Sequence, residues 1–491
     1  MLIALWLTCN PLSARSAAGI FDFSPRCQQA YQHFMALRPA AGRQLLLQER
    51  SQHPRNLMPV YIEDYEDCLS LLFNGDPDLF GKRLPLMESR LAALKTGDAA
   101  SPWHLFSQAG IYFHWALVQF RFGDNLKAAL NFRRSLLLLR ENQKKHPHFS
   151  QNRYLTGAQE AVLGTIPDDY KWIASLFGMK GDVRKGIAEM SRFLASSSPS
   201  APLREEASIL YVYLRYYLLS EQKEAWAYVN GPSFPIDNNL LRAFVRTNLA
   251  INFRKADAAI EALRQVATLP DYSKYPLFDY EMGTALLYGL DPQAPVYLGR
   301  FVNRFRGRYY IKDALAKMSY AYYLGGDKAK ADECRRRILK SGAQHVDADK
   351  QAHRFAAEAS WPLPALLQAR LLVDGGYFEK ALQRLHTLKQ QDLPGVPEKL
   401  EYAFRLGRVY DELRDKARAI QSYQSAVALG RKRKEYFGAR AALQLGLMYE
   451  RESNPGEAIR WFRECLSMKG HDFQASIDQQ AKAGLNRLNG K

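Results

Sequence analysis

Two pairs of neighbouring carboxylates are the side chains whose type and spacing come closest to those of a catalytic site. Asp64 lies two residues before Glu66, and Asp168 directly precedes Asp169. One carboxyl group acting as an acid and another as a base is a common arrangement in hydrolysis. Each pair also fits the exposed face or cap of a helix, where carboxylates are solvated. We predict solvated carboxylates at both places.

The sequence signatures of common catalytic and cofactor sites are absent. There is no His-Glu-x-x-His, no Gly-x-Ser-x-Gly and no Gly-x-x-x-x-Gly-Lys-Ser/Thr run. His146 and His148 flank a proline with no further ligand nearby, and the five cysteines are too scattered for a zinc site or a disulfide framework. We therefore predict a protein without catalytic residues, metal or cofactor. The alternative is a hydrolase or transferase with an unrecognised site between the N-terminal and C-terminal halves of the chain.

The formal net charge of +18 favours acidic partners. Twelve basic and only four acidic residues fall between Tyr297 and Gly342. This stretch is either a solvated outer face or a surface for an acidic protein or an anionic lipid. A nucleic-acid surface is not expected, because the tyrosines of this stretch recur at helical spacing and are interpreted as packing residues rather than stacking platforms.

Nearly the whole chain has the pattern of amphipathic helices, with apolar residues recurring every three or four positions. Ser24 and Pro25 form a typical helix start, and the glycine pairs Gly325-Gly326 and Gly375-Gly376 are typical of helix ends. No run of apolar residues approaches the length of a membrane-spanning helix. The sequence therefore predicts an all-α fold without a transmembrane helix.

One pattern occurs twice near the C-terminus, with an offset of 39 residues. The first copy consists of Leu406, Gly407, Tyr410, Ala419 and Tyr423, and the second of Leu445, Gly446, Tyr449, Ala458 and Phe462. This spacing resembles the tetratricopeptide repeat (TPR), in which small residues allow two helices to cross closely and aromatic residues fill the gap between hairpins. Weaker copies extend upstream. The predicted fold is a right-handed superhelical solenoid of antiparallel helix hairpins, because no hairpin can bury its apolar face alone.

The repeat pattern and the N-terminus together suggest four segments. We predict a signal peptide at residues 1–18, an irregular TPR-like domain at 19–270, a regular TPR array at 271–475 and a capping helix at 476–491. The signal peptide is suggested by apolar Leu2–Leu7 and the small residues up to Ala18. The expected location is therefore the periplasm or cell envelope, with the cytoplasm as the alternative.

The resemblance to TPRs implies a concave groove lined by the first helix of each repeat. The positions that the resemblance places in this groove are Arg370, Asp374, Phe404, Arg408, Asp411, Glu412, Arg440 and Glu450. Arg370 and Arg408 are equivalent positions, which we expect to stack and to bind carboxylates through their planar guanidinium groups. The alternative is that each arginine pairs with a neighbouring acid such as Asp374 or Asp411. The predicted function is a non-catalytic scaffold that binds a protein or peptide.

A segment between the two halves resembles the tetratricopeptide repeat protein 39 family and its bacterial relatives. It contains Phe177-Gly178-Met179-Lys180-Gly181-Asp182, with Met179 where the family usually has phenylalanine, followed by Gly186 at a helix crossing. Ile209–Leu219 and Tyr309–Asp313 are also similar to family members. The resemblance implies a repeat scaffold and supplies no catalytic residues.

Overall fold

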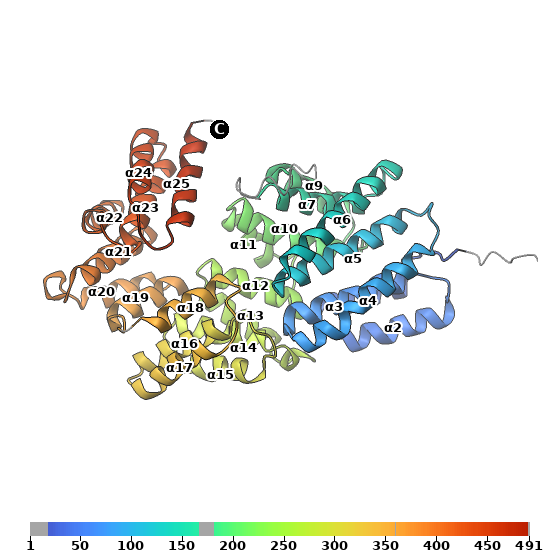
Figure 1. Ribbon diagram of the computed structural model, residues 1–491, viewed down its shortest axis with the longest axis horizontal. Coiled ribbons are helices and arrows are strands. Elements are labelled where there is room, and N and C mark those ends of the chain that lie inside the picture. The colour runs from blue at the N-terminus through green and yellow to red at the C-terminus, as the bar shows by residue number, and fades with distance from the viewer. Residues whose placement is uncertain (1–17, 166–180, 359, 490–491) are drawn as a thin grey trace, which may run out of the picture. The chain divides into compact units, whose positions relative to one another are not determined.

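The computed structural model describes residues 18–165, 181–358 and 360–489. Within these ranges the protein has 24 α-helices, two short 3-10 helices and no β-strand. The chain divides into two compact units, residues 1–242 and 243–491, whose helices are labelled in Figure 1. Among the described helices, none has the length and apolar character needed to cross a bilayer. The predicted all-α fold is confirmed.

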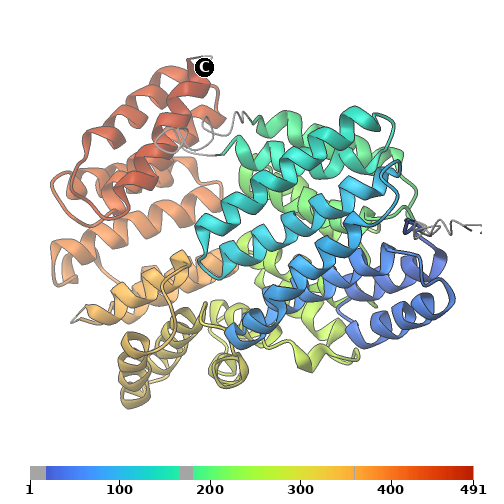
Figure 2. The ribbon, with the colours of Figure 1, turned by 45° about the vertical axis from the view of Figure 1, so that its right-hand side comes forward.

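The first unit is built from consecutive helices joined by short loops. Its described helices are α1 (Pro25–Met35), α2 (Pro39–Gln52), α3 (Met58–Asn74), α4 (Pro77–Lys95), α5 (Pro102–Arg121), α6 (Asn125–Lys145), α7 (Gln151–Leu163), α9 (Val183–Ser196), α10 (Arg204–Leu218) and α11 (Gln222–Asn230). Helices α5 and α6 lie side by side as a long hairpin (Figures 1 and 2). Helix α3 packs against α1, α2, α4 and α5, so it is enclosed by neighbours.

The second unit continues with hairpins. Helix α12 (Leu240–Asn252) crosses the division, and then come α13 (Ala256–Val266), α14 (Leu277–Tyr288), α15 (Ala294–Arg304), α16 (Ile311–Leu324), α17 (Lys328–Lys340), α18 (Asp347–Ala357), α19 (Pro364–Gly375), α20 (Phe378–His386), α21 (Val396–Glu412), α22 (Lys416–Gly430), α23 (Phe437–Arg451), α24 (Pro455–Ser467) and α25 (Gln474–Leu488). The 3-10 helices are η2 (Tyr272–Lys274) and η3 (Gln390–Asp392). The stretch predicted to cap the array is α25, which packs on α23 and α24. The predicted boundary at residue 270 stays a prediction.

The helix ends follow the local signals in the sequence. The Ser24 hydroxyl accepts a hydrogen bond from the backbone N–H of Cys27, as an N-cap should. Helix α19 ends at Gly375, and Gly376 adopts a left-handed conformation with φ of +88°. Such a C-cap favours glycine because a side chain would be strained there.

Glycines mark the points where helices approach most closely. A Cβ atom at Gly186 of α9 would lie 2.4 Å from the backbone oxygen of Gly157 on α7, so the crossing predicted at Gly186 is present. In the C-terminal repeats, Gly446 of α23 faces Phe462 of α24, and its Cβ would lie 2.5 Å from that ring. The four cysteines among the described residues are free and buried, consistent with packing roles.

Candidate partner-binding site

A cavity of about 290 Å³ lies on the face of α21 and α23 in the second unit. Residues from six parts of this unit line it: Arg254, Gln351, Phe404, Arg408, Asp411, Glu412, Tyr423, Tyr436, Arg440, Gln444, Phe473, Ser476 and Ile477. We call it the α21–α23 cavity. It includes five of the residues that the TPR frame predicts to face the groove, namely Phe404, Arg408, Asp411, Glu412 and Arg440.

Helical spacing explains why these residues meet. Phe404, Arg408, Asp411 and Glu412 of α21 are separated by steps of four, three and one residues, so they share one face of the helix. Arg440 holds a similar position on α23, the first helix of the next hairpin. Because α21 and α23 pack against each other, the two faces form one continuous surface.

Most charged residues of the cavity have a partner of opposite charge. Arg254 pairs with Glu412, and Asp411 accepts a hydrogen bond of 2.8 Å from Arg451. Arg408 lies 3.8 Å from Asp374, within reach of a weak ion pair. These pairs neutralise much of the charge that lines the cavity.

Arg440 is the exception. Its guanidinium donates a hydrogen bond of 3.1 Å to the neutral side chain of Gln480, and no carboxylate among the described residues lies within ion-pair distance. Burial lowers the pKa of Arg440, and the positive charge of Arg408 lowers it further. A half-buried cation beside a second cation is an electrostatically unfavourable arrangement, which a bound anion would relieve.

Aromatic side chains form much of the remaining wall. Phe404 and Tyr423 are buried in the core of the unit, with 3% and 1% of their surface exposed. Tyr436 and Phe473 meet edge to face at a centroid distance of 5.1 Å, and 37% of Phe473 is exposed. The cavity therefore combines an available cation with apolar surface, which suits an acidic side chain or terminus carried on a peptide.

Three of the predicted groove residues do not line this cavity. Arg370 stacks over the ring of Tyr320 at 4.8 Å, and Asp374 is the partner of Arg408. Glu450 accepts two hydrogen bonds of 2.8 and 2.7 Å from Arg487 of α25. Both Arg370 and Arg408 thus have partners within the protein, and the stacking of Arg370 on Arg408 stays a prediction. Partner binding by these residues stays a prediction.

The comparison with protein families bears directly on the helices of this cavity. Residues 400–431 and 439–472 match the tetratricopeptide repeat. The first stretch covers most of α21 and all of α22, and the second most of α23 and all of α24. The two helices that line the cavity are therefore the first helices of two consecutive TPRs, as the sequence pattern predicted.

The comparisons with curated proteins and with solved structures give less information about function. No curated protein matches this chain. Among solved structures, the APC/C hetero-tetramer Cut9–Hcn1 is 13% identical, with 93% of this chain and 95% of that chain covered at a TM-score of 0.28. The TPR domain of P58(IPK) is 15% identical, with 88% and 98% covered at a TM-score of 0.22. Naa15/Naa10 bound to HypK-THB is 12% identical, with 94% and 78% covered at 0.21. At these TM-scores the superpositions support no statement about function.

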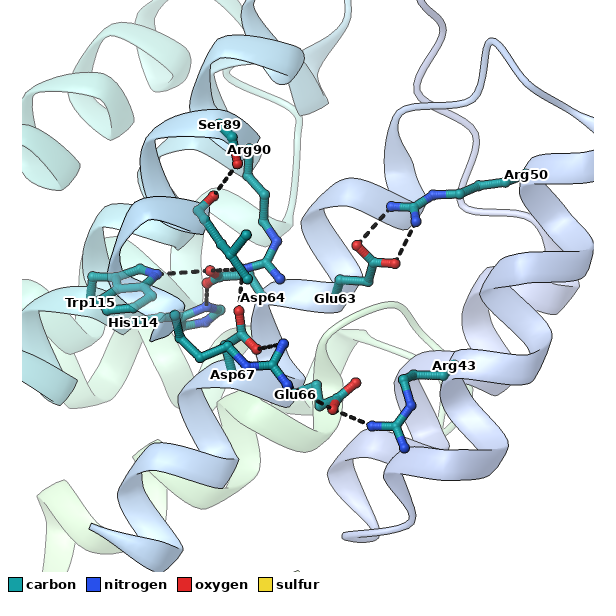
Figure 3. A network of polar contacts seen from close by, with 12 residues as sticks. Arg43, Arg50, Glu63, Asp64, Glu66, Asp67, Ser89, Arg90, His114 and Trp115 are labelled. Carbon is teal, nitrogen blue, oxygen red and sulfur yellow. Dashed lines mark hydrogen bonds and ion pairs between the residues drawn. The ribbon is translucent and has the colours of Figure 1, made fainter. Parts of the chain in front are cut away.

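The first unit contains a second group of polar side chains, drawn in Figure 3. Asp64 is fully buried, accepts a hydrogen bond of 3.0 Å from the Trp115 indole, and lies 2.7 Å from His114 and 3.4 Å from Arg90. Glu66 is 8% exposed and pairs with Arg43. The prediction of solvated carboxylates is wrong for this pair, because α3 is enclosed by neighbouring helices that supply the partners. Asp168 and Asp169 lie outside the described residues.

A buried glutamate forms the inner end of the same group. Glu206 of α10 accepts hydrogen bonds from the hydroxyls of Tyr65 (2.6 Å) and Tyr154 (2.8 Å) and lies 3.1 Å from Nε2 of His114. Burial would raise the pKa of Glu206, but His114 and the two hydroxyls lower it. Burial would also lower the pKa of His114, but Glu206 and Asp64 raise it to about 9. His114 is therefore protonated between two carboxylates at neutral pH.

The outer end of this group opens on a cleft of about 370 Å³ between α2 and α4. Arg43 and Arg50 on α2 are seven residues apart, and so are Arg83 and Arg90 on α4, so each pair faces α3. All four arginines lie within ion-pair distance of carboxylates on α3. The sequence carried a signal for this network in the two seven-residue arginine spacings, which flank the acidic helix. Because every charge is matched, the network serves to hold α2 and α4 on α3.

The basic stretch from residue 297 to 342 is only partly a surface. Arg300 and Arg304 bind Asp279 at 2.7 and 3.4 Å. Arg335 is 8% exposed and lies over the rings of Phe355 and Trp361 at 4.9 and 5.2 Å. Part of the positive charge of this stretch is therefore engaged in contacts within the protein.

Proposed function

We propose that this protein is a non-catalytic scaffold that binds a peptide segment of a partner protein in the α21–α23 cavity. The observation that carries the proposal is Arg440. It is a half-buried cation without a carboxylate partner among the described residues, and it lines a cavity between the first helices of two TPRs. An acidic group on the partner would supply the missing charge.

The expected contact is a charge-assisted hydrogen bond. The planar guanidinium of arginine can hold both oxygens of a carboxylate, and hydrogen bonds to charged groups contribute about 1.5–3 kcal/mol. Exposed Phe473 and half-exposed Tyr436 offer apolar surface to neighbouring residues of the same peptide. Arg408 adds positive charge to the site but is already shared with Asp374.

A peptide library displayed against the full-length protein tests the proposal. We expect the selected peptides to share an aspartate, a glutamate or a free carboxyl terminus beside apolar residues. Synthetic versions in which that carboxylate becomes an amide should bind at least about tenfold more weakly. Selection of peptides without any acidic group, or no selection above background, would contradict it.

Two finer predictions belong with this proposal. Relationship to the tetratricopeptide repeat protein 39 family is supported by Gly186 at the α7–α9 crossing, while Phe177–Lys180 lie outside the described residues. The cell-envelope setting stays a prediction based on the first 18 residues. Sequencing the N-terminus of the protein isolated from its native cell would test it, since an intact Met1 on cytosolic protein would contradict export.

A further inference from the structure

The outward face of α6 carries an unusual line of apolar side chains. Leu126, Leu130 and Leu137 are 73%, 41% and 44% exposed. At 3.6 residues per turn they fall within about 40° of one another around the helix axis. The opposite face holds buried Ala128, Ser135 and Leu139, so the leucine line lies on the side of α6 that faces away from its packing contacts.

The preceding helix of the same hairpin also carries exposed apolar side chains. Leu117 and Phe120, near the end of α5, are 37% and 70% exposed. Because α5 ends at Arg121 and α6 begins at Asn125, Phe120 lies at the end of α5 next to the hairpin turn, and Leu117 lies about one helical turn before it. Five of the twelve exposed large hydrophobic residues in the described part of the chain thus belong to this one hairpin. Scattered exposed apolar residues are ordinary, whereas a contiguous group marks an interaction surface.

The charges of α6 indicate which kind of partner this surface binds. Residues 125–145 contain six basic residues and one acidic residue. Arg134 and Arg140 lie on opposite sides of the leucine line, each about 60° from it. Exposed Arg140 and Lys144 have no carboxylate within ion-pair distance among the described residues, and Arg134 contacts only the neutral side chains of Tyr112 and Asn131.

We propose that the outer face of α6, defined by Leu126, Leu130 and Leu137 together with Phe120, binds an anionic lipid surface. An apolar line flanked on both sides by arginine and lysine is the arrangement of helices that lie in the plane of a membrane interface. The leucines and the phenylalanine enter the boundary of the acyl chains, and the flanking cations meet negatively charged headgroups. Each basic residue near such a surface contributes about 1 kcal/mol of attraction.

This site is separate from the α21–α23 cavity, which lies in the other unit and uses an arginine to bind a single acidic group. The lipid surface fits α6 because the basic residues flank the apolar line on both sides rather than converging on one point. An acidic amphipathic protein is the competing occupant, and the experiment distinguishes the two.

The experiment measures sedimentation of the full-length protein with vesicles. One set contains phosphatidylcholine alone, and the other an equimolar mixture with phosphatidylglycerol. We expect binding to the anionic vesicles, weak binding to the neutral ones, and loss of binding as salt is raised. The double substitution Leu126→Asp with Leu130→Asp should reduce binding about tenfold or more, since it removes apolar contact and adds negative charge.

Leu47→Asp is the control. Leu47 is 66% exposed on α2, outside the face of α6, so this variant should bind as the parent does. Far-ultraviolet circular dichroism should confirm that both variants remain folded, as expected for exposed positions. The proposal is wrong if the parent does not sediment with anionic vesicles, or if the Leu126→Asp/Leu130→Asp variant sediments equally well. It is also wrong if the parent is a dimer that this variant dissociates, because the face is then a contact between two copies.

Discussion

Gly407 of α21 lies against the ring of Tyr423 of α22 so closely that a Cβ atom at residue 407 would be 2.4 Å from Cδ1 of Tyr423. The equivalent pair of the next repeat, Gly446 and Phe462, has the same relationship at 2.5 Å. A glycine on the first helix therefore admits an aromatic ring from the second helix in both repeats. This contact fixes how the two helices of each hairpin cross.

Substitution of this glycine should destabilise the second unit. Gly407→Ala places a methyl group inside the Tyr423 ring contact, and overpacking of this kind costs about 1–3 kcal/mol. Gly407→Leu and Ala419→Leu should cost more, since Ala419 is also fully buried. The control is Gly299→Ala within α15, where the added Cβ meets only Met318 at 3.7 Å. The melting temperature should fall for the first three variants and should stay the same or rise for the control. Equal melting temperatures for all four variants would contradict the repeat frame.

Glu206 should be essential to the stability of the first unit. Glu206→Leu leaves protonated His114 with one carboxylate fewer and removes the acceptor of the Tyr65 and Tyr154 hydroxyls. Removing one partner of a buried ion pair costs about 3–5 kcal/mol. Chemical denaturation measures this loss. Glu189→Leu, which removes an exposed pair with Arg192, should change stability by less than about 1 kcal/mol; similar losses for the two variants would contradict the central position of Glu206.

The raised pKa of His114 predicts a loss of stability at alkaline pH. Folding raises the pKa from 6.5 to about 9, so the protonated form is favoured in the folded state. The resulting stabilisation, about 3 kcal/mol, is fully present below pH 6.5 and is lost as the pH rises through 9. The free energy of unfolding, measured between pH 6 and about 9.5, should fall more steeply for the parent than for His114→Asn. Parallel pH profiles would show that His114 is not charged in the folded protein.

The repeat architecture was predictable because its signals are local. Gly407 and Tyr423 are 16 residues apart and recur as Gly446 and Phe462, so one frame located the hairpins and the faces of α21 and α23. Phe404, Arg408 and Arg440, which the same frame places in the predicted groove, line one cavity. It could not show that Arg254 and Phe473, distant in sequence, complete the cavity.

The polar network of the first unit was not predictable in the same way. Tyr65 and Glu206 are 141 residues apart, and His114 and Glu206 are 92 apart. Within α3 alone, Asp64 and Glu66 look like ordinary solvated acids. Their burial follows from the packing of four other helices around α3, which no local pattern specifies.

The affinity of an acidic peptide for the parent and for Arg440→Glu tests the central claim most directly. A peptide selected from the library should bind the parent, and Arg440→Glu should raise its Kd by about tenfold or more, the equivalent of about 1.4 kcal/mol. Arg463→Glu, an exposed arginine of α24 outside the cavity, makes the same charge change and should leave the Kd within about twofold, a difference of about 0.4 kcal/mol. Isothermal titration calorimetry gives both values, and circular dichroism confirms folding. If Arg440→Glu binds the peptide as tightly as the parent does, or if both substitutions weaken peptide binding equally, the α21–α23 cavity is not the partner-binding site.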